Sequence, residues 1–156
     1  MSEDQERGFV SLRRLLLVFI AGYVVAYLTI PLLALVVHAQ DYLVATVTSY
    51  HYDRSKDYNE SNFGLGIERR YSDECAWSVG YFKNSLYRNT VYVFAGYTPY
   101  RYMGWRYGVV VGAVTGYESG VSPWLTGVAT RDYGRFGVNI VLAASAIALQ
   151  VKVKWN

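Results

Sequence analysis

After residue 40, apolar side chains alternate with polar or small ones, and this period of two limits the fold more than any other feature. Successive side chains of a β-strand point to opposite faces, so the pattern predicts strands rather than helices. Clusters of Gly, Pro, Asn, Asp and Ser interrupt it. The predicted strands lie at residues 42–51, 62–71, 75–83, 89–98, 105–117, 124–131, 135–143 and 146–155.

The short segments between these strands are predicted to be turns. They lie at residues 57–61, 72–74, 87–89, 99–104, 118–123 and 132–134. Short connections favour antiparallel neighbours, and closing the sheet removes its exposed edges. We therefore predict an all-β fold, an eight-stranded antiparallel up-and-down β-barrel at residues 40–156, preceded by one N-terminal hydrophobic helix.

The last predicted strand has one apolar and one polar face. The apolar face consists of Leu149, Val151, Val153 and Trp155, and the polar face of Gln150, Lys152 and Lys154. A soluble barrel would turn the apolar face inward, whereas a membrane barrel would turn it outward. Alternation in this strand alone leaves both arrangements open.

The predicted strand at 105–117 favours the membrane arrangement. One face carries Trp105, Tyr107, Val109, Val111, Ala113, Thr115 and Tyr117, so aromatic residues stand at both ends, as in interfacial girdles. The other face carries Arg106, Gly108, Val110, Gly112, Val114 and Gly116, which suit a narrow lumen. Residues 89–98 are apolar on both faces. The alternative is an oligomer that buries the outer face of the barrel.

Composition points in the same direction. Hydrophobic residues form 53% of the chain and charged residues only 17%, against about a quarter in ordinary soluble domains. This shortage of charge indicates membrane contact or a large apolar interface. The basic residues form no run, which argues against nucleic-acid binding. Cys75 is the only cysteine, and no Cys/His spacing suits a metal, so neither a metal nor another cofactor is predicted.

Residues 1–39 are predicted to direct export. Arg13 and Arg14 precede an uncharged apolar run at residues 15–37, which is long enough for a transmembrane helix. Residues 37–39 resemble a signal-peptidase site, with cleavage before Gln40, whereas the length of the run and the acidic residues near Met1 favour an uncleaved signal anchor. Both alternatives place the barrel in the bacterial cell envelope, either in the outer membrane or in the periplasm, anchored to the inner membrane.

Three polar residues are predicted to meet at one rim of the barrel. His51 ends the first strand, and Asn84 and Ser85 follow the third. The first and third strands of a meander run in the same direction, so both ends fall on one rim. There His51 could act as a general base for Ser85, with Asn84 as the orienting group. The alternative is that all three are ordinary strand-end and turn residues.

Other residues are predicted to line the lumen. Glu68, Arg106 and Lys152 are expected to form a paired or solvated polar network. Phe94, Val110 and Val114 are expected to form an apolar wall that could hold an acyl chain.

Several short segments resemble the lipid A palmitoyltransferase family. They are His51–Arg54, Tyr58–Glu60, Phe63–Gly66, Phe82–Ser85 and Gly112–Thr115. The resemblance implies an outer-membrane barrel that moves an acyl chain from phospholipid to lipid A, using a His, an Asp and a Ser at the outer rim. Ser85 matches the family's Ser, whereas Asn84 occupies the Asp position. The chain also resembles small barrel proteins of unknown function from bacteria and phages.

Two functions follow as hypotheses. The first is a membrane-associated barrel of the cell envelope, bacterial or phage-encoded, with a non-catalytic role in binding or assembly. Its expected partners are membrane lipid, envelope or virion proteins, or a second copy of the chain. The alternative is an acyltransferase that acts on lipid A or phospholipid with the acyl chain in the lumen.

Overall fold

The computed structural model describes residues 39–117 and 120–156. The helix predicted at about 15–37 lies outside these residues, as does most of the segment predicted as a signal peptide or anchor. Within the described ranges, no helix has the length and apolar character that a membrane crossing requires.

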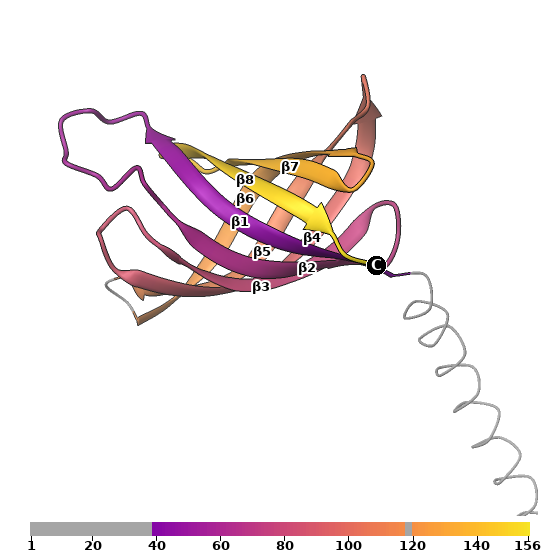
Figure 1. Cartoon of the computed structure of the whole chain (residues 1–156). Helices are drawn as coiled ribbons and strands as arrows, with labels where there is room; N and C mark the ends of the chain where they lie inside the picture. The colour runs from indigo at the N-terminus through magenta and orange to yellow at the C-terminus, as the bar shows by residue number, and fades with distance from the viewer. Residues whose placement is uncertain (1–38, 118–119) are drawn as a thin grey trace, which may run out of the picture. The chain divides into compact units, whose positions relative to one another are not determined.

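Eight antiparallel strands close into a barrel, which confirms the predicted all-β fold (Figure 1). The strands are β1 (Gln40–His51), β2 (Gly64–Arg70), β3 (Cys75–Lys83), β4 (Asn89–Tyr102), β5 (Trp105–Tyr117), β6 (Gly120–Tyr133), β7 (Phe136–Leu142) and β8 (Ala146–Lys154). Each strand pairs with the next along the chain, and β1 pairs with β8 to close the sheet.

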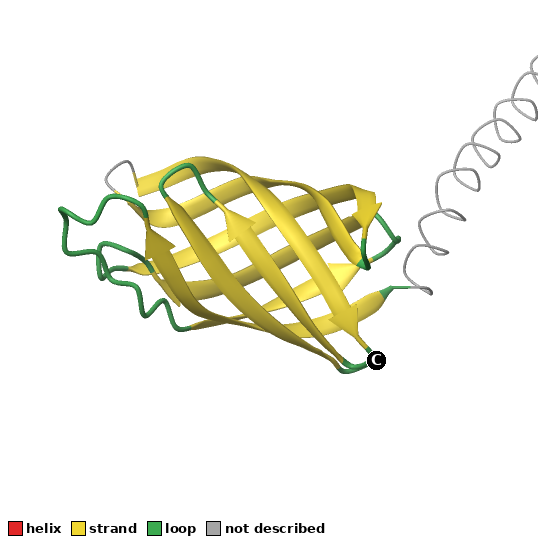
Figure 2. Ribbon diagram, turned by 90° about the horizontal axis from the view of Figure 1, so that it is seen from above, coloured by secondary structure: helices red, strands yellow, loops and turns green. Residues whose placement is uncertain are grey.

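The two ends of the barrel differ (Figure 2). At one end, here called the loop end, residues 52–63, 84–88 and 143–145 form the connections. At the other, the terminal end, residue 39 and the C-terminus lie beside short turns at 71–74, 103–104 and 134–135. The backbone N–H of Trp155 donates to the Asp41 carbonyl at 3.1 Å, which holds the C-terminus against the start of β1.

Two prolines that were predicted to lie in turns lie inside strands. Pro99 sits in a bulge of β4, between the paired residues Tyr97 and Tyr100, and Pro123 lies in β6 opposite Ala113. Residues 120–126 pair with β5 only, because the pairing of β6 with β7 begins at Gly127. A proline has no N–H to donate, so it is tolerated where one side of a strand lacks a partner.

The apolar face of the strands points outward. On β8, Leu149, Val151 and Val153 are exposed, whereas Lys152 is buried in the lumen. All eight strands contribute exposed apolar residues, among them Leu43, Ile67, Val79, Val93, Val111, Leu125, Leu142 and Val151. The barrel therefore has apolar residues outside and charged residues inside, the arrangement that the sequence predicted for a membrane barrel.

Irregularities at the loop end change which side chains face inward. The register of β5 against β6 shifts between Thr115 and Tyr117, and Gly116 has a φ of +79°. Such a bulge flips the residues that follow it. Tyr117, predicted on the outer face, lines the lumen instead. A second shift, between Thr46 and Thr48 of β1, turns His51 inward.

Candidate functional site

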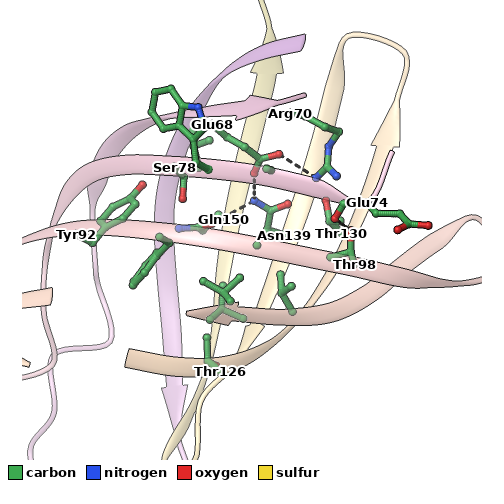
Figure 3. A pocket seen from close by; sticks show the side chains of 18 residues that line it. Glu68, Arg70, Glu74, Ser78, Tyr92, Thr98, Thr126, Thr130, Asn139 and Gln150 are labelled. Atoms are coloured by element: carbon green, nitrogen blue, oxygen red, sulfur yellow. Dashed lines mark hydrogen bonds and ion pairs between the residues drawn. The ribbon is translucent and has the colours of Figure 1, made fainter. Parts of the chain in front are cut away.

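The lumen contains two cavities with different linings. The loop cavity, of about 240 Å³, reaches the loop end, where Ser85, Ala143 and Ser145 form part of its wall. The terminal cavity, of about 60 Å³, lies toward the terminal end, where Arg70, Glu74 and Thr98 contribute (Figure 3). Phe94, Val141 and Gln150 line both cavities. The two spaces are therefore neighbours along the barrel axis.

Five charged residues meet inside the barrel near the terminal end, and we call them the charged cluster. They are Glu68, Arg70, Arg106, Asp132 and Lys152. The Lys152 Nζ atom lies 2.8 Å from Glu68 Oε1 and 3.2 Å from Asp132 Oδ1, and it also donates to Thr130 at 3.0 Å. The cluster thus joins β2, β5, β6 and β8 across the lumen.

Further contacts orient the cluster. Arg70 Nη2 donates to Glu68 Oε1 at 3.1 Å, and Asn139 Nδ2 donates to Glu68 Oε2 at 3.0 Å (Figure 3). Arg106 pairs with Asp132. The Lys152 ammonium lies 4.6 Å from the centre of the Tyr42 ring, which is itself buried. Charges removed from water need such partners, because an unpaired buried charge is strongly destabilising.

His51 occupies the wall of the loop cavity. Its side chain is 7% exposed, and its ring stacks on Tyr58 with the centroids 4.4 Å apart. The Nδ1 atom lies 4.0 Å from Glu60 Oε1, beyond hydrogen-bonding distance, and has no hydrogen-bond partner. The His51 backbone N–H instead donates to Glu60 Oε1 at 3.1 Å. One ring nitrogen is therefore buried without a hydrogen-bond partner among the described residues.

Asn84 is fully engaged in holding the chain together. Its Nδ2 donates to Thr90 Oγ1 and to the Gly116 carbonyl, both at 3.0 Å. Its Oδ1 accepts the backbone N–H groups of Leu86 at 2.9 Å and Arg88 at 3.0 Å. Two donor hydrogens and two acceptor positions are the whole capacity of a side-chain amide. Asn84 thus fixes the β3–β4 connection to β5 and has no free group with which to orient His51.

Ser85 lies on the wall of the same cavity as His51, so the structure brings these two predicted residues to one space. In the described part of the chain, no hydrogen bond joins them. The Ser85 hydroxyl is instead within hydrogen-bonding range of the Tyr117 phenol. The His–Ser contact that a nucleophile needs is therefore not formed here.

The residues predicted to line the lumen do face it. Phe94 lines both cavities, Val114 the loop cavity, and Val110 and Glu68 the terminal cavity. Arg106 and Lys152 belong to the charged cluster.

Several lumen residues were not predicted from the sequence, among them Asp132, Arg70, Trp124 and Tyr117. Asp132 falls in a segment predicted as a turn, yet it lies within β6. Arg70 is two residues after Glu68 on the same face of β2, so strict alternation would have found it. Trp124 shares one face of β6 with other lumen residues, so alternation would have found it too. Tyr117 follows the bulge of β5, where the alternation breaks.

No protein-family model and no curated protein matches this chain. The likeness to lipid A palmitoyltransferases thus rests on the short segments described above. Within residues 39–117 and 120–156, no three His, Cys, Asp or Glu side chains are grouped so as to hold a metal ion.

Proposed function

We propose that the barrel spans a membrane of the bacterial cell envelope and binds an apolar or amphiphilic ligand in its lumen without transforming it. The observation that carries this proposal is the inverted distribution of side chains, with apolar residues on the outside of all eight strands and the charged cluster within. Soluble barrels have the opposite arrangement.

The spread of the outer apolar residues favours lipid over a protein partner. A second copy of the chain would cover one side of the barrel, because an interface between two subunits is a single patch. Exposed apolar side chains occur instead around the whole circumference, from Leu43 on β1 to Val151 on β8. Lipid is the partner that covers all sides at once. Insertion would place the barrel in the cell envelope, to which the signal or anchor proposed at residues 1–39 would direct it.

Binding is supported by the contents of the lumen. The loop cavity combines apolar walls, such as Phe94 and Val114, with a few polar groups, and this mixture is typical of sites for small molecules. The charged cluster fills the lumen below it, so an open channel is not expected. Because Asn84 is saturated and no hydrogen bond joins His51 to Ser85 in the described part of the chain, the arrangement favours binding over catalysis.

Tryptophan fluorescence in vesicles of brominated phospholipid tests the membrane proposal. Trp77 is exposed on the outer face of β3, whereas Trp124 lines the loop cavity. Variants that keep only one of the chain's four tryptophans would be reconstituted as the whole chain. We expect strong quenching for the Trp77 variant and weak quenching for the matched Trp124 variant. Equal, weak quenching of both would contradict insertion.

The location within the envelope has a separate test. Sequencing the N-terminus of the exported protein distinguishes the two predictions for residues 1–39. A terminus at Gln40 favours an outer-membrane barrel, and an intact Met1 favours a barrel anchored to the inner membrane. Crosslinking in cells would show whether envelope or virion proteins are further partners.

The presence of His51 and Ser85 on one apolar cavity favours a second candidate, an acyltransferase that acts on lipid A or phospholipid. A change of rotamer would have to bring the Ser85 hydroxyl to the free Nδ1 atom of His51. Mass spectra of lipid A and phospholipids from cells that express the protein test this candidate. Spectra that are unchanged, and identical to those of the Ser85→Ala variant, would remove it.

A further inference from the structure

Arg70 is the least satisfied of the charged groups in the lumen. Its side chain is 7% exposed and, among residues 39–117 and 120–156, makes one hydrogen bond, from Nη2 to Glu68. The Nε and Nη1 atoms are buried and have no hydrogen-bond partner. A guanidinium carries five donor hydrogens in a planar fork that suits a carboxylate. Arg70 also lines the terminal cavity, so a small shift of its side chain would turn these buried free donors toward that space.

The charge of the cluster is unbalanced. Arg70, Arg106 and Lys152 contribute three positive charges, and Glu68 and Asp132 contribute two negative charges, which leaves one positive charge in excess. Lys152 bridges both carboxylates, so neither is free to serve Arg70 fully. A buried excess charge favours the uptake of a counter-ion.

We propose that the terminal cavity is an anion site in which Arg70 binds the carboxylate group of a monoanion. One negative charge neutralises the net positive charge of the charged cluster, whereas a dianion would make the net charge negative. A cavity of about 60 Å³ has room for a group of a few heavy atoms. Thr98 and Thr130 line the same cavity as Arg70 and add polar surface to it.

One acidic residue competes for this site. Glu74 lines the cavity near Arg70, but it is exposed and forms no ion pair with Arg70 (Figure 3). Its carboxylate lies at the terminal end and can be solvated there. Removing it by Glu74→Gln should therefore tighten anion binding, since one negative charge beside the entry is lost.

Two kinds of ligand carry a carboxylate that Arg70 could bind in this way. It can belong to a small free acid or to the head of a fatty acid. A fatty acid would place its chain past Phe94 and Val141, which line both cavities, and into the loop cavity. The site itself depends only on the lumen, and it holds whether or not the outer face meets lipid.

The whole chain in detergent, with potassium gluconate at constant ionic strength, is the test system. Gluconate serves as the reference anion, because its hydroxylated chain is too large for the terminal cavity and too polar for the apolar passage past Phe94 and Val141. We expect potassium acetate to raise the thermal unfolding midpoint, because a ligand that binds only the folded state stabilises it. The Arg70→Gln variant should lose this rise, with at least about tenfold weaker binding. Arg101→Gln, which removes an exposed arginine paired with Asp73, is the matched control and should keep it.

Potassium octanoate separates the two sources. Octanoate that binds at least about tenfold more tightly than acetate, and only when Arg70 is present, assigns the site to a fatty acid head, because the chain adds apolar burial. Equal affinities assign it to a small free carboxylate.

If Arg70→Gln does not fold, a measurement on the unaltered chain still tests the proposal. The Nε–H resonance of Arg70 should move on addition of acetate, and that of Arg101 should not. No shift of the Arg70 resonance, or an acetate effect that persists in Arg70→Gln, would overturn the proposal. Neither result would bear on the quenching of Trp77 by lipid.

Discussion

The two halves of the lumen are held together in different ways. In the terminal half, ion pairs between strands join the charged cluster directly across the barrel. In the loop half, Asn59, Asn62 and Asn84 donate to backbone carbonyls and fix the connections to the strands. The first arrangement leaves a cavity of only about 60 Å³, whereas the second leaves one of about 240 Å³. The difference indicates that the terminal half supports the fold and has room for a small group only, whereas the loop half has room for a larger ligand.

The largest expected effect comes from Glu68→Gln in the terminal half. This change leaves three cations beside one carboxylate, and breaking a buried ion pair costs about 3–5 kcal/mol. We expect that loss in the free energy of unfolding, measured by urea titration in detergent. Lys152→Met is the matched comparison, because it leaves two balanced pairs, Glu68 with Arg70 and Asp132 with Arg106. An equal or larger loss for Lys152→Met would show that charge balance does not govern this half.

A second prediction concerns the border between the halves. The Tyr92 ring stacks on Phe94, with centroids 4.9 Å apart, and its hydroxyl lies over Gly66. A Cβ atom on Gly66 would lie 2.2 Å from that hydroxyl and 2.7 Å from the Val79 carbonyl. Overpacking of this kind costs about 1–3 kcal/mol, and we expect Gly66→Ala near the upper limit because one contact is backbone.

The control for this prediction is an inward glycine with more room. A Cβ atom on Gly96 would meet its nearest neighbour at 3.7 Å, so Gly96→Ala should change the free energy of unfolding little. Adding Tyr92→Phe to Gly66→Ala should recover part of the loss, since the hydroxyl contact is removed. No recovery in this double variant would mean that the Val79 carbonyl alone sets the strain.

The sequence predicts the barrel well because alternation and turn residues carry that information locally. All eight strands were found, and the two faces of β5 correctly favoured an apolar outer face, although the bulge at Gly116 turns Tyr117 inward. The errors at Pro99 and Pro123 have a common cause. Whether a proline fits a strand depends on the neighbouring strand. Unequal strand lengths leave β4 without β3 beyond Tyr97, and β6 without β7 before Gly127.

The candidate site is harder to predict for a related reason. A single inserted residue reverses every face that follows it. Strict alternation from Tyr42 places His51 outside, and the shift between Thr46 and Thr48 brings it inside. Asn84 shows a different limit of prediction from sequence, because an asparagine can either orient a catalytic histidine or stabilise a turn. Only its four hydrogen bonds distinguish the two roles.

A third prediction tests the role of Asn84 in the loop half. Asn84→Asp restores the acid that the resemblance to palmitoyltransferases implies, but it replaces two donors by an oxygen facing the Gly116 carbonyl and Thr90. We expect a loss of about 2 kcal/mol in the free energy of unfolding, from unsatisfied buried acceptors. Asn89→Asp, at an exposed position on β4, is the control. A stable Asn84→Asp variant that gains acyltransferase activity would favour the enzyme over the binding protein.

The smallest expected effect is the response of the loop half to acid. The hydrogen bond from the His51 backbone N–H, followed by that from Arg54, holds the pKa of the exposed Glu60 carboxyl below its ordinary value of 4.5. A lowered pKa in the folded state means that the ionised form stabilises the fold. This contribution is complete above the pKa of the unfolded chain and is lost as pH falls through the lower folded pKa. Burial also lowers the pKa of His51, which stacks on Tyr58, below its ordinary value of 6.5, so the fold begins to lose stability when pH falls below that value. Hydrogen exchange of residues 52–63, corrected for the intrinsic rate, should therefore be unchanged from about pH 8 to pH 7 and increase in more acidic solution. The part of this increase that is seen only below about pH 5 should come from Glu60. Glu60→Gln should remove most of that part, while the charged cluster keeps the terminal half protected over the same range. Acid loosening that begins in the terminal half would instead show that the cluster is the weaker of the two.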